Sequence, residues 1–321
     1  MPTTKRPFGS GNVHYLSSEH RGFGFDKSVP AALTVESGDT VVFQCREAYD
    51  GQITRNATLQ EVEELDWARL HAVTGPVEVV GAEPGDILMA EILEFEHEGW
   101  GYTAIFPGFG LLPDEFPDYA LHVWSVDSDG WAELTPRVHV PVEPFCGVMG
   151  VAPAAPGLQP TLPPTALGGN MDNRHLCTGS IVYFPVQTPG ALLSVGDGHL
   201  AQGDGEVCGI AIEAPLTVTI RLSVLKGRTI WSVECGLTRD TTQRARGAGY
   251  HVTTAAGQDL QQGARNAVRM MIDYLESERG LKRTEAYILC SVAGDLKIAV
   301  PVLGEGHASN VTFHMPLSVF R

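Results

Sequence analysis

The sequence predicts an α+β protein rich in β-structure, with sandwich- or barrel-like antiparallel sheets and a helical segment near the C-terminus. Glycine (36 residues) and proline (21 residues) are abundant among the 321 residues, a composition that favours strands joined by turns. Apolar and polar residues alternate in several short runs, as they do in half-buried strands. A strong helical periodicity occurs only in the last quarter of the chain.

Strand-turn-strand patterns recur along the first two thirds of the chain. Residues 30–46, PAALTVESGDTVVFQCR, and 75–95, GPVEVVGAEPGDILMAEILEF, each place a turn ending in Gly-Asp between two apolar segments. Residues 124–134, WSVDSDGWAEL, predict a hairpin around Asp-Gly. Further strands are expected in IVYFPV, ALLSV and LTVTIRLSVL, which lie between 181 and 225. We interpret each Gly-Asp turn as joining a pair of β-strands.

Two segments rich in glycine and proline interrupt this pattern. Residues 100–120 are predicted to form a loop over the surface, of the kind that often lines a site. Residues 141–170 contain too many prolines for a regular helix or a central strand. The second segment is either a linker or an ordered wall of a site. The start of this segment divides the chain into a β-rich part, 1–140, and a second part, 141–321, unless the two form one intertwined domain.

The helical segment is expected at 258–279. The residues of its apolar stripe recur at helical spacing, and they are Leu260, Ala264, Val268, Met271 and Leu275. Gly280 follows where a C-terminal capping glycine is expected. A second, shorter helix is predicted over 284–292.

The formal net charge of −16 disfavours nucleic acid and anionic membranes as partners, since both require clustered Lys and Arg. No apolar segment follows the basic residues in MPTTKRPFGSGNVHY, and no apolar run approaches ~20 residues. The six cysteines form no Cys-x-x-Cys pair and are expected to be mostly buried thiols. These features predict a cytoplasmic protein that binds a small molecule.

Two motifs gather carboxylates, a histidine and glycines in short runs. GGNMDN (168–173) places Asp172 beside Asn170 on an irregular segment, where an Asx-turn is the alternative to a ligand site. SVGDGHLAQGDGEVCGIAIE (194–213) brings Asp197 and His199 to one face if that segment is extended. A histidine with carboxylates is a common metal-binding set, and a polar hairpin loop is the alternative.

Glu213 lies in the apolar run GIAIEAPL, where a carboxylate is expected to be ion-paired, metal-bound or raised in pKa. Asp50 in EAYDGQI and His71 in RLHAVTGPV are weaker candidates, and His71 has a structural, hydrogen-bonded histidine as its alternative. Cys146 in PFCGVMG is a nucleophile candidate without an identifiable histidine base. Its alternative is a buried or site-lining thiol.

Taken in order, the motifs resemble those of the acetamidase/formamidase family. The resemblance is carried by FDKSVPAALTVESGDTVVFQCREAYDGQI, TGPVEVVGAEPGDILMAEIL, PFCGVMGVAP, GGNMDN, VGDGHLAQGDGEVCGIAIE and EAYILCSVAGDLKIA. It implies a β-rich fold, hydrolysis of short amides to carboxylate and ammonia, metal-assisted chemistry and a homo-oligomer. Two rival classes remain, a Cys146-dependent amidase and a non-catalytic metal- or ligand-binding β-protein.

The resemblance also implies roles for individual residues. Asp172 and His199 would be metal ligands, with Asp50 or His71 completing the set, and Glu213 would be the general base. The metal would be zinc, with calcium or manganese as alternatives. Asp204 and Cys146 are further catalytic candidates. Asn170, Gly169 and Gly198 are candidates for contact with a small amide substrate, since glycines allow the backbone to approach it closely.

Overall fold

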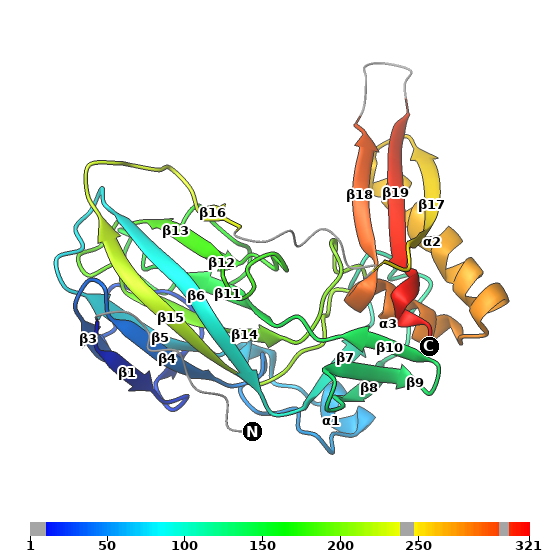
Figure 1. Cartoon of the computed structure of the whole chain (residues 1–321), viewed down its shortest axis with the longest axis horizontal. Helices are drawn as coiled ribbons and strands as arrows, with labels where there is room; N and C mark the ends of the chain where they lie inside the picture. Colours follow the sequence, from blue (N-terminus) through cyan, green and yellow to red (C-terminus); the bar gives the residue numbers. More distant parts are fainter. Residues whose placement is uncertain (1–10, 238–246, 302–307) are drawn as a thin grey trace.

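Two six-stranded sheets pack face to face and form a β-sandwich at one end of the molecule (Figure 1). The structure is a computed structural model that describes residues 11–237, 247–301 and 308–321. The first sheet has the order β1-β4-β15-β6-β13-β16, with β1 (Val13–Leu16), β4 (Thr40–Cys45), β15 (Leu216–Leu225), β6 (Ile87–His97), β13 (Ile181–Pro185) and β16 (Glu234–Gly236). The second has the order β12-β11-β14-β5-β2, and β3 also pairs with β5; its strands are β12 (Gly168–Asn170), β11 (Phe145–Gly150), β14 (Leu193–His199), β5 (Val73–Val79), β2 (Arg21–Gly22) and β3 (Leu33–Val35).

The sandwich core follows from the alternation in these strands. Phe43 in β4 and Ile220 in β15 point inward from the first sheet, while Val77 in β5 and Val195 in β14 point inward from the second. All four side chains are fully buried. Burial of this apolar area stabilises the pairing of the two sheets. The predicted β-rich class with antiparallel sheets is confirmed, apart from the parallel pairs β1–β4 and β3–β5.

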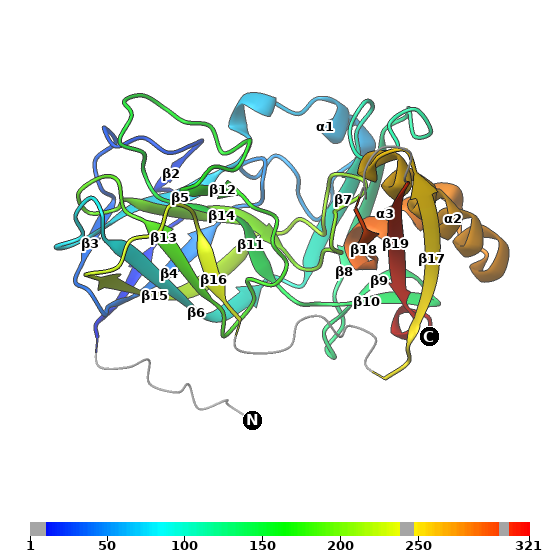
Figure 2. The same cartoon turned by 90° about the horizontal axis from the view of Figure 1, so that it is seen from above.

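The other end of the molecule combines small sheets with helices (Figures 1 and 2). The strands there are β7 (Trp100–Ile105) paired with β8 (Ala120–Ser125), β9 (Trp131–Thr135) paired with β10 (Val138–Pro141), and the sheet β17-β19-β18, made of β17 (Tyr250–Gly257), β19 (Ser309–Pro316) and β18 (Asp295–Val300). Helices α2 (Leu260–Arg279) and α3 (Arg283–Ala293) pack with these strands in one large apolar cluster. The chain ends after the 3₁₀ turn η2 (Leu317–Val319).

Both predicted C-terminal helices are present. The side chain of Asp259 accepts a hydrogen bond from the backbone N–H of Gln262 at the start of α2, and Gly280 ends that helix at φ 68°. The predicted apolar stripe is buried from Ala264 onward, whereas Leu260 is 37% exposed. Within the described parts of the chain, no helix is both long and apolar enough to span a membrane.

A short helix and a 3₁₀ turn precede β5 and were not predicted. Helix α1 (Leu59–Glu63) begins with a capping box in which Thr58 and Glu61 exchange side-chain and backbone hydrogen bonds. The turn η1 (Trp67–Arg69) is capped by Asp66, which accepts from the backbone N–H of Ala68. The sequence signal for helix α1 is the Thr-x-x-Glu capping-box pattern formed by Thr58 and Glu61.

Two loop predictions are wrong in part. Residues 100–105 form the fully buried strand β7, and only 106–119 connect it to β8. Residues 145–150 form β11, a central strand between β12 and β14. The proline argument fails there because the prolines flank this strand and none interrupts FCGVMG.

The Gly-Asp turns join strands of different sheets. Strands β3 and β4 flank the first turn but belong to opposite sheets, and the same holds for β5 and β6 at the second. The predicted strands therefore exist, while their pairing with each other is wrong. Both sandwich sheets contain strands from either side of residue 140.

Candidate active site

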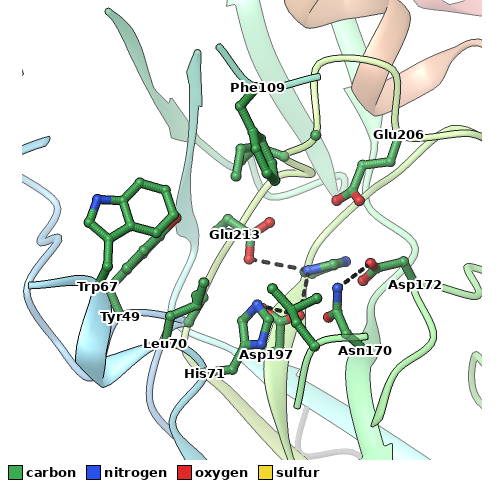
Figure 3. Close-up of a pocket in the computed structure, with 15 residues that line it drawn as sticks. Tyr49, Trp67, Leu70, His71, Phe109, Asn170, Asp172, Asp197, Glu206 and Glu213 are labelled. Atoms are coloured by element: carbon green, nitrogen blue, oxygen red, sulfur yellow. Dashed lines mark hydrogen bonds and ion pairs between the residues drawn. The ribbon is translucent and has the colours of Figure 1, made fainter. Parts of the chain in front are cut away.

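Four carboxyl groups and the His199 imidazole, from three segments, meet in one cavity of about 250 Å³ (Figure 3). The end of β14 contributes Asp197 and His199, and the segment after β12 contributes Asp172. The stretch that follows β14 contributes Glu206 and Glu213. The two motifs singled out in the sequence therefore form one site.

Strand β14 runs from the apolar core into this cavity. Leu193 and Val195 at its start pack in the sandwich core, whereas Asp197 and His199 at its end line the cavity. All seven residues of the strand are buried. The GDGH sequence is thus part of a buried strand, and the alternative of a polar hairpin loop does not hold.

The His199 imidazole lies at the centre of the cluster. Its Nε2 is 3.4 Å from Asp197 Oδ2 and 3.2 Å from Glu213 Oε2. Its Nδ1 is 2.9 Å from the side-chain oxygen of Gln202, whose amide nitrogen donates to the backbone carbonyl of Asp172. Because that amide is held with its oxygen toward the ring, Nδ1 carries a proton and donates to it. Nε2 is then the nitrogen that faces the carboxylates.

Burial and mutual charge separate the pKa values of the four carboxyl groups. Burial raises the pKa of Asp172 to about 7 and that of Glu213 to about 8, although His199 opposes both shifts. Burial also raises the pKa of Glu206, with Asp172 adding to the effect. For Asp197, burial acts in the same direction but is outweighed by the nearby His71 and His199 imidazoles, so its pKa is lowered.

The carboxylates and imidazole of this cavity fit a bound cation. Two overlapping sets, Asp172–Asp197–His199 and His199–Glu206–Glu213, each place their ligand atoms within 4.8 Å of one another. Glu213 Oε2 is buried and, despite its proximity to His199 Nε2, has no hydrogen bond of acceptable geometry. Imidazole nitrogen with several carboxylate oxygens suits zinc and related divalent metals. Without a cation, the burial of so many acidic groups is unfavourable.

Gly147 in β11 forms the wall directly behind the cluster. A Cβ atom at this position would lie 2.5 Å from Asp197 Oδ2 and 2.7 Å from Asp172 Oδ1. Real Cβ atoms do not approach oxygen this closely. The absence of a side chain at residue 147 therefore allows the two carboxylates to occupy their positions.

Three of the acidic residues in the cavity have left-handed backbone conformations. The φ angles are 44° at Asp172, 56° at Asp197 and 42° at Glu206. A non-glycine residue adopts this region at a cost of order 1–3 kcal/mol, and such residues cluster at functional sites. The surrounding fold therefore directs these side chains toward the cavity against local backbone preference.

His71 and Asn170, two further sequence candidates, also line the cavity. His71 Nδ1 is 2.8 Å from the hydroxyl of Thr161, and its Nε2 is 3.9 Å from Asp197 Oδ2. Burial lowers the pKa of His71 despite the opposing charge of Asp197. The side chain of Asn170 donates to Asp172 Oδ2 at 2.7 Å, while its own Oδ1 is buried without a partner. Residues 161–170 thus contribute to a wall of the site.

The structure does not bring Asp50, Asp204 or Cys146 to the cavity. Asp50 is held by three arginines: Arg21 at 2.5 Å, Arg46 at 3.1 Å, and Arg69. Asp204 pairs with His175 at 3.2 Å and with Arg174 at 3.7 Å. Cys146 is buried in the sandwich core, where a hydrogen bond with Cys45 and burial raise the pKa of its thiol. An elevated thiol pKa is unfavourable for a nucleophile.

The candidate glycines contact neighbouring backbone. A Cβ at Gly169 would lie 2.8 Å from the carbonyl oxygen of Thr161, and one at Gly198 would lie 2.5 Å from that of Ala214. Neither residue lines the cavity. Both glycines therefore allow close packing of adjacent segments.

Other lining and supporting residues had weak signals in the sequence. Asp197 and Glu206 stand in the motif that the sequence singled out, but nothing local distinguished them from Asp204. Gln202 follows His199 by three residues, and Gly147 follows the cysteine of PFCGVMG. Trp67 carries no motif, and Tyr49 stands in EAYDGQI beside the candidate Asp50 without a signal of its own, so only the fold brings them to the cavity.

Comparisons with known proteins agree with this picture. A model of the acetamidase/formamidase family matches residues 18–160 and 154–321. The acetamidase of Mycolicibacterium smegmatis is 32% identical over 266 residues, covering 62% of this chain and 64% of that protein. The formamidase of Methylophilus methylotrophus is 30% identical over 259 residues, covering 62% of each. The chain thus matches less than two thirds of the length of these curated relatives.

Solved structures share the fold over nearly the whole chain. A predicted acetamidase/formamidase from Thermoanaerobacter tengcongensis superimposes with a TM-score of 0.68 at 30% identity, covering 96% of both chains. A gamma lactamase from Delftia acidovorans gives a TM-score of 0.85 at 24% identity, covering 94% of this chain and 89% of that one, and this likeness concerns the fold alone. With the family model matching almost all of the described sequence, the chain belongs to the acetamidase/formamidase family.

Proposed function

We propose that this protein is a metal-dependent hydrolase that cleaves a short aliphatic amide to a carboxylate and ammonia. The observation that carries the proposal is the small cavity in which His199 faces Asp172, Asp197, Glu206 and Glu213. The acetamidase and formamidase names of the relatives support the same reaction class. Amide hydrolysis needs an activated water and a proton donor for the departing nitrogen, and both can come from such a site.

Asp172, Asp197 and His199 would hold the cation, which we propose to be zinc, with calcium or manganese as alternatives. Their ligand atoms form one compact set, and the proton that His199 Nδ1 donates to Gln202 leaves Nε2 available. The chemistry that a divalent cation would supply there is polarisation of the amide carbonyl and a lowering of the pKa of water toward ~7. Gln202 fixes the orientation of the ring and contacts the backbone of Asp172 at the same time.

Glu213 is our candidate for proton transfer. Its Oε1 accepts from the backbone N–H of Ala211 at 3.1 Å, which fixes the carboxyl group, while Oε2 lies 3.2 Å from His199 Nε2. A carboxylate held in this way can take a proton from water and pass it to the leaving nitrogen. This is the role that the family resemblance implies for Glu213.

Asn170 supplies a specific contact for the amide group. Its Oδ1 is a buried acceptor without a partner in the described structure, and its Nδ2 is already used by Asp172. A buried carboxamide oxygen of this kind is satisfied by an N–H donor. We propose that it accepts a hydrogen bond from the –NH₂ group of the substrate.

Ammonia release from formamide and acetamide tests the proposal, with metal content measured on the same protein. We expect chelation to abolish activity and zinc, manganese or calcium to restore it. Asp172→Asn is expected to lose both metal and activity, and Asp129→Asn, an exposed residue in the β8–β9 turn, is the matched control. Activity that survives complete metal removal would overturn metal dependence. A metal-loaded protein that releases no ammonia from these two amides or from longer aliphatic amides would overturn the amidase assignment.

We further propose that the protein acts in the cytoplasm as a homo-oligomer, a dimer or higher. All six cysteines are free thiols, which is typical of a reducing compartment. Soluble enzymes commonly form closed symmetric assemblies. Light scattering on the purified protein tests the oligomeric state, and fractionation of cells that produce it tests the compartment.

A further inference from the structure

The cavity has a polar half and an apolar half. In Figure 3, Asp172, Asn170 and Glu206 lie on the right and Trp67, Tyr49 and Leu70 on the left, with Glu213 and His71 between the two groups. Phe109, Leu162 and Ile210 complete the apolar lining. A ligand that fills the whole space must therefore have one polar end and one apolar end.

The volume exceeds what the smallest amides require. A cavity of about 250 Å³ far exceeds the roughly 10–15 Å³ of cavity volume that a single water molecule requires. Formamide has three non-hydrogen atoms and acetamide has four. Either would leave the apolar half of the cavity unfilled, and its lining would lose the dispersion contacts that a filled pocket provides.

Large apolar side chains at the opening are exposed, and this needs an explanation. Trp67 is 45% exposed, Phe109 is 44% exposed and Leu162 is 40% exposed, and all three line this one cavity. They come from three separate segments of the chain, so their proximity is a product of the fold. Exposed apolar groups gathered around an opening are typical of a ligand-binding site.

The aromatic wall is held rigidly in place. Trp67 packs edge to face against Tyr49 at 5.4 Å and against Phe106 at 5.0 Å between ring centroids. The η1 turn that carries it is capped by Asp66 and tied down by Arg69, whose guanidinium binds Asp50. On the opposite side, the Phe109 ring packs closely against Gly209, and the backbone N–H of Leu111 donates to the carbonyl of Val207. Little ordering is therefore needed when an apolar group enters.

We propose that the preferred substrate is an amide whose acyl group is apolar and larger than acetyl, of about four to seven carbons, bound between Trp67 and Phe109. This inference rests on the proposed amide hydrolysis and specifies its substrate class. The amide end occupies the polar half beside Asn170, and the acyl chain lies along Trp67, Leu162 and Leu70. Trp67 is the main specificity-determining residue, because it offers the largest apolar surface there.

A substrate series on the metal-loaded protein tests this. We expect kcat/KM to rise from acetamide through butanamide to hexanamide by roughly fourfold per added methylene group, and benzamide to be accepted. Trp67→Ala and Leu162→Ala are expected to reduce kcat/KM for hexanamide at least tenfold more than for acetamide. Trp231→Ala is the matched control, since Trp231 is 88% exposed and does not line the cavity. A kcat/KM that falls from acetamide to hexanamide would overturn the inference.

A binding measurement separates this inference from the proposed function. Benzamide and acetamide are titrated into chelator-treated protein in a calorimeter, and we expect tighter binding of benzamide that Trp67→Ala weakens. If acetamide is hydrolysed but kcat/KM does not rise for longer amides, only the acyl preference is overturned. Selective benzamide binding without ammonia release from any amide overturns the hydrolase function and leaves the apolar site standing. If benzamide does not bind and no amide releases ammonia, both the acyl preference and the hydrolase function are overturned.

Discussion

Replacing Gly147 with alanine tests whether the acidic cluster depends on the missing side chain. The added Cβ would lie 2.5 Å from Asp197 Oδ2 and 2.7 Å from Asp172 Oδ1, against about 3.4 Å for an ordinary contact. Both carboxylates must therefore shift by roughly 0.7–0.9 Å, or β11 must move. Overpacking of this kind costs typically about 1–3 kcal/mol.

The cost is expected to appear as weaker metal binding, because the two displaced carboxylates are proposed ligands. If the whole overpacking cost appears in metal binding, the affinity for the metal falls by about 5- to 150-fold, at about 1.4 kcal/mol per factor of ten. Calorimetric zinc titration of chelator-treated Gly147→Ala protein measures this directly. Gly236→Ala in β16 is the control, because its Cβ would meet Tyr183 at an ordinary 3.9 Å. Unchanged zinc affinity and unchanged kcat/KM in the Gly147 variant would refute the assignment of Asp172 and Asp197.

Three further substitutions probe separate parts of the structure. Glu213→Gln keeps the size of the side chain and removes its basicity, so we expect kcat to fall by about 10²–10⁴-fold with metal content retained; equal kcat would exclude Glu213 as the proton-transfer group. Gln202→Leu removes the acceptor for His199 Nδ1, so zinc affinity should fall about 10–100-fold in a calorimetric titration, and an unchanged value would contradict the orienting role. Asp50→Asn leaves three arginines without their shared carboxylate and should lower the free energy of unfolding by about 3 kcal/mol in urea titrations at pH 7. Burial raises the pKa of Asp50, but hydrogen bonding and charge from Arg69 and Arg21 outweigh it and the pKa is lowered. Its contribution is therefore complete above the unfolded pKa of about 3.9 and is lost as pH falls through the folded value; a difference between variant and parent that does not shrink as pH falls below about 3.9 would contradict this account.

The sequence predicted local structure better than pairing. The alternation in β15 and the capping glycine after α2 act within a few residues, and both are present as expected. The sheet that a strand joins depends on partners far away in the chain, and this is why the strands at each Gly-Asp turn were wrongly paired with each other. Strand β11 was missed because prolines nearby concealed a six-residue run that contains none.

The candidate site shows the same division between local and long-range information. Asp172, His199 and Glu213 belong to motifs with unusual local composition, and all three line the cavity. Asp50 has the same side chain as Asp172, but three arginines from elsewhere in the fold surround it. No local pattern could have supplied that distinction, since Arg21, Arg46 and Arg69 are spread over nearly fifty positions.

The contrast between Asp204 and Glu206 explains why the site needs the C-terminal helices and sheet. The two residues stand two positions apart in GDGE, yet only Glu206 reaches the cavity. Gly203 donates a backbone hydrogen bond to Ser291 at the end of α3, and the carbonyl of Asp204 accepts one from Leu296 in β18. Beyond the turn, the backbone N–H of Cys208 donates to the hydroxyl of Ser291.

These bonds fix the segment on both sides of Glu206, which itself adopts a left-handed φ of 42°. A carboxylate on an exposed turn would point to water, because solvation is favourable and the backbone conformation would be relaxed. The junction of α3 and β18 therefore supplies the constraint that turns Glu206 toward His199. The C-terminal helices and sheet act as a support that completes a site whose other acidic groups come from the sandwich and the segments that leave it.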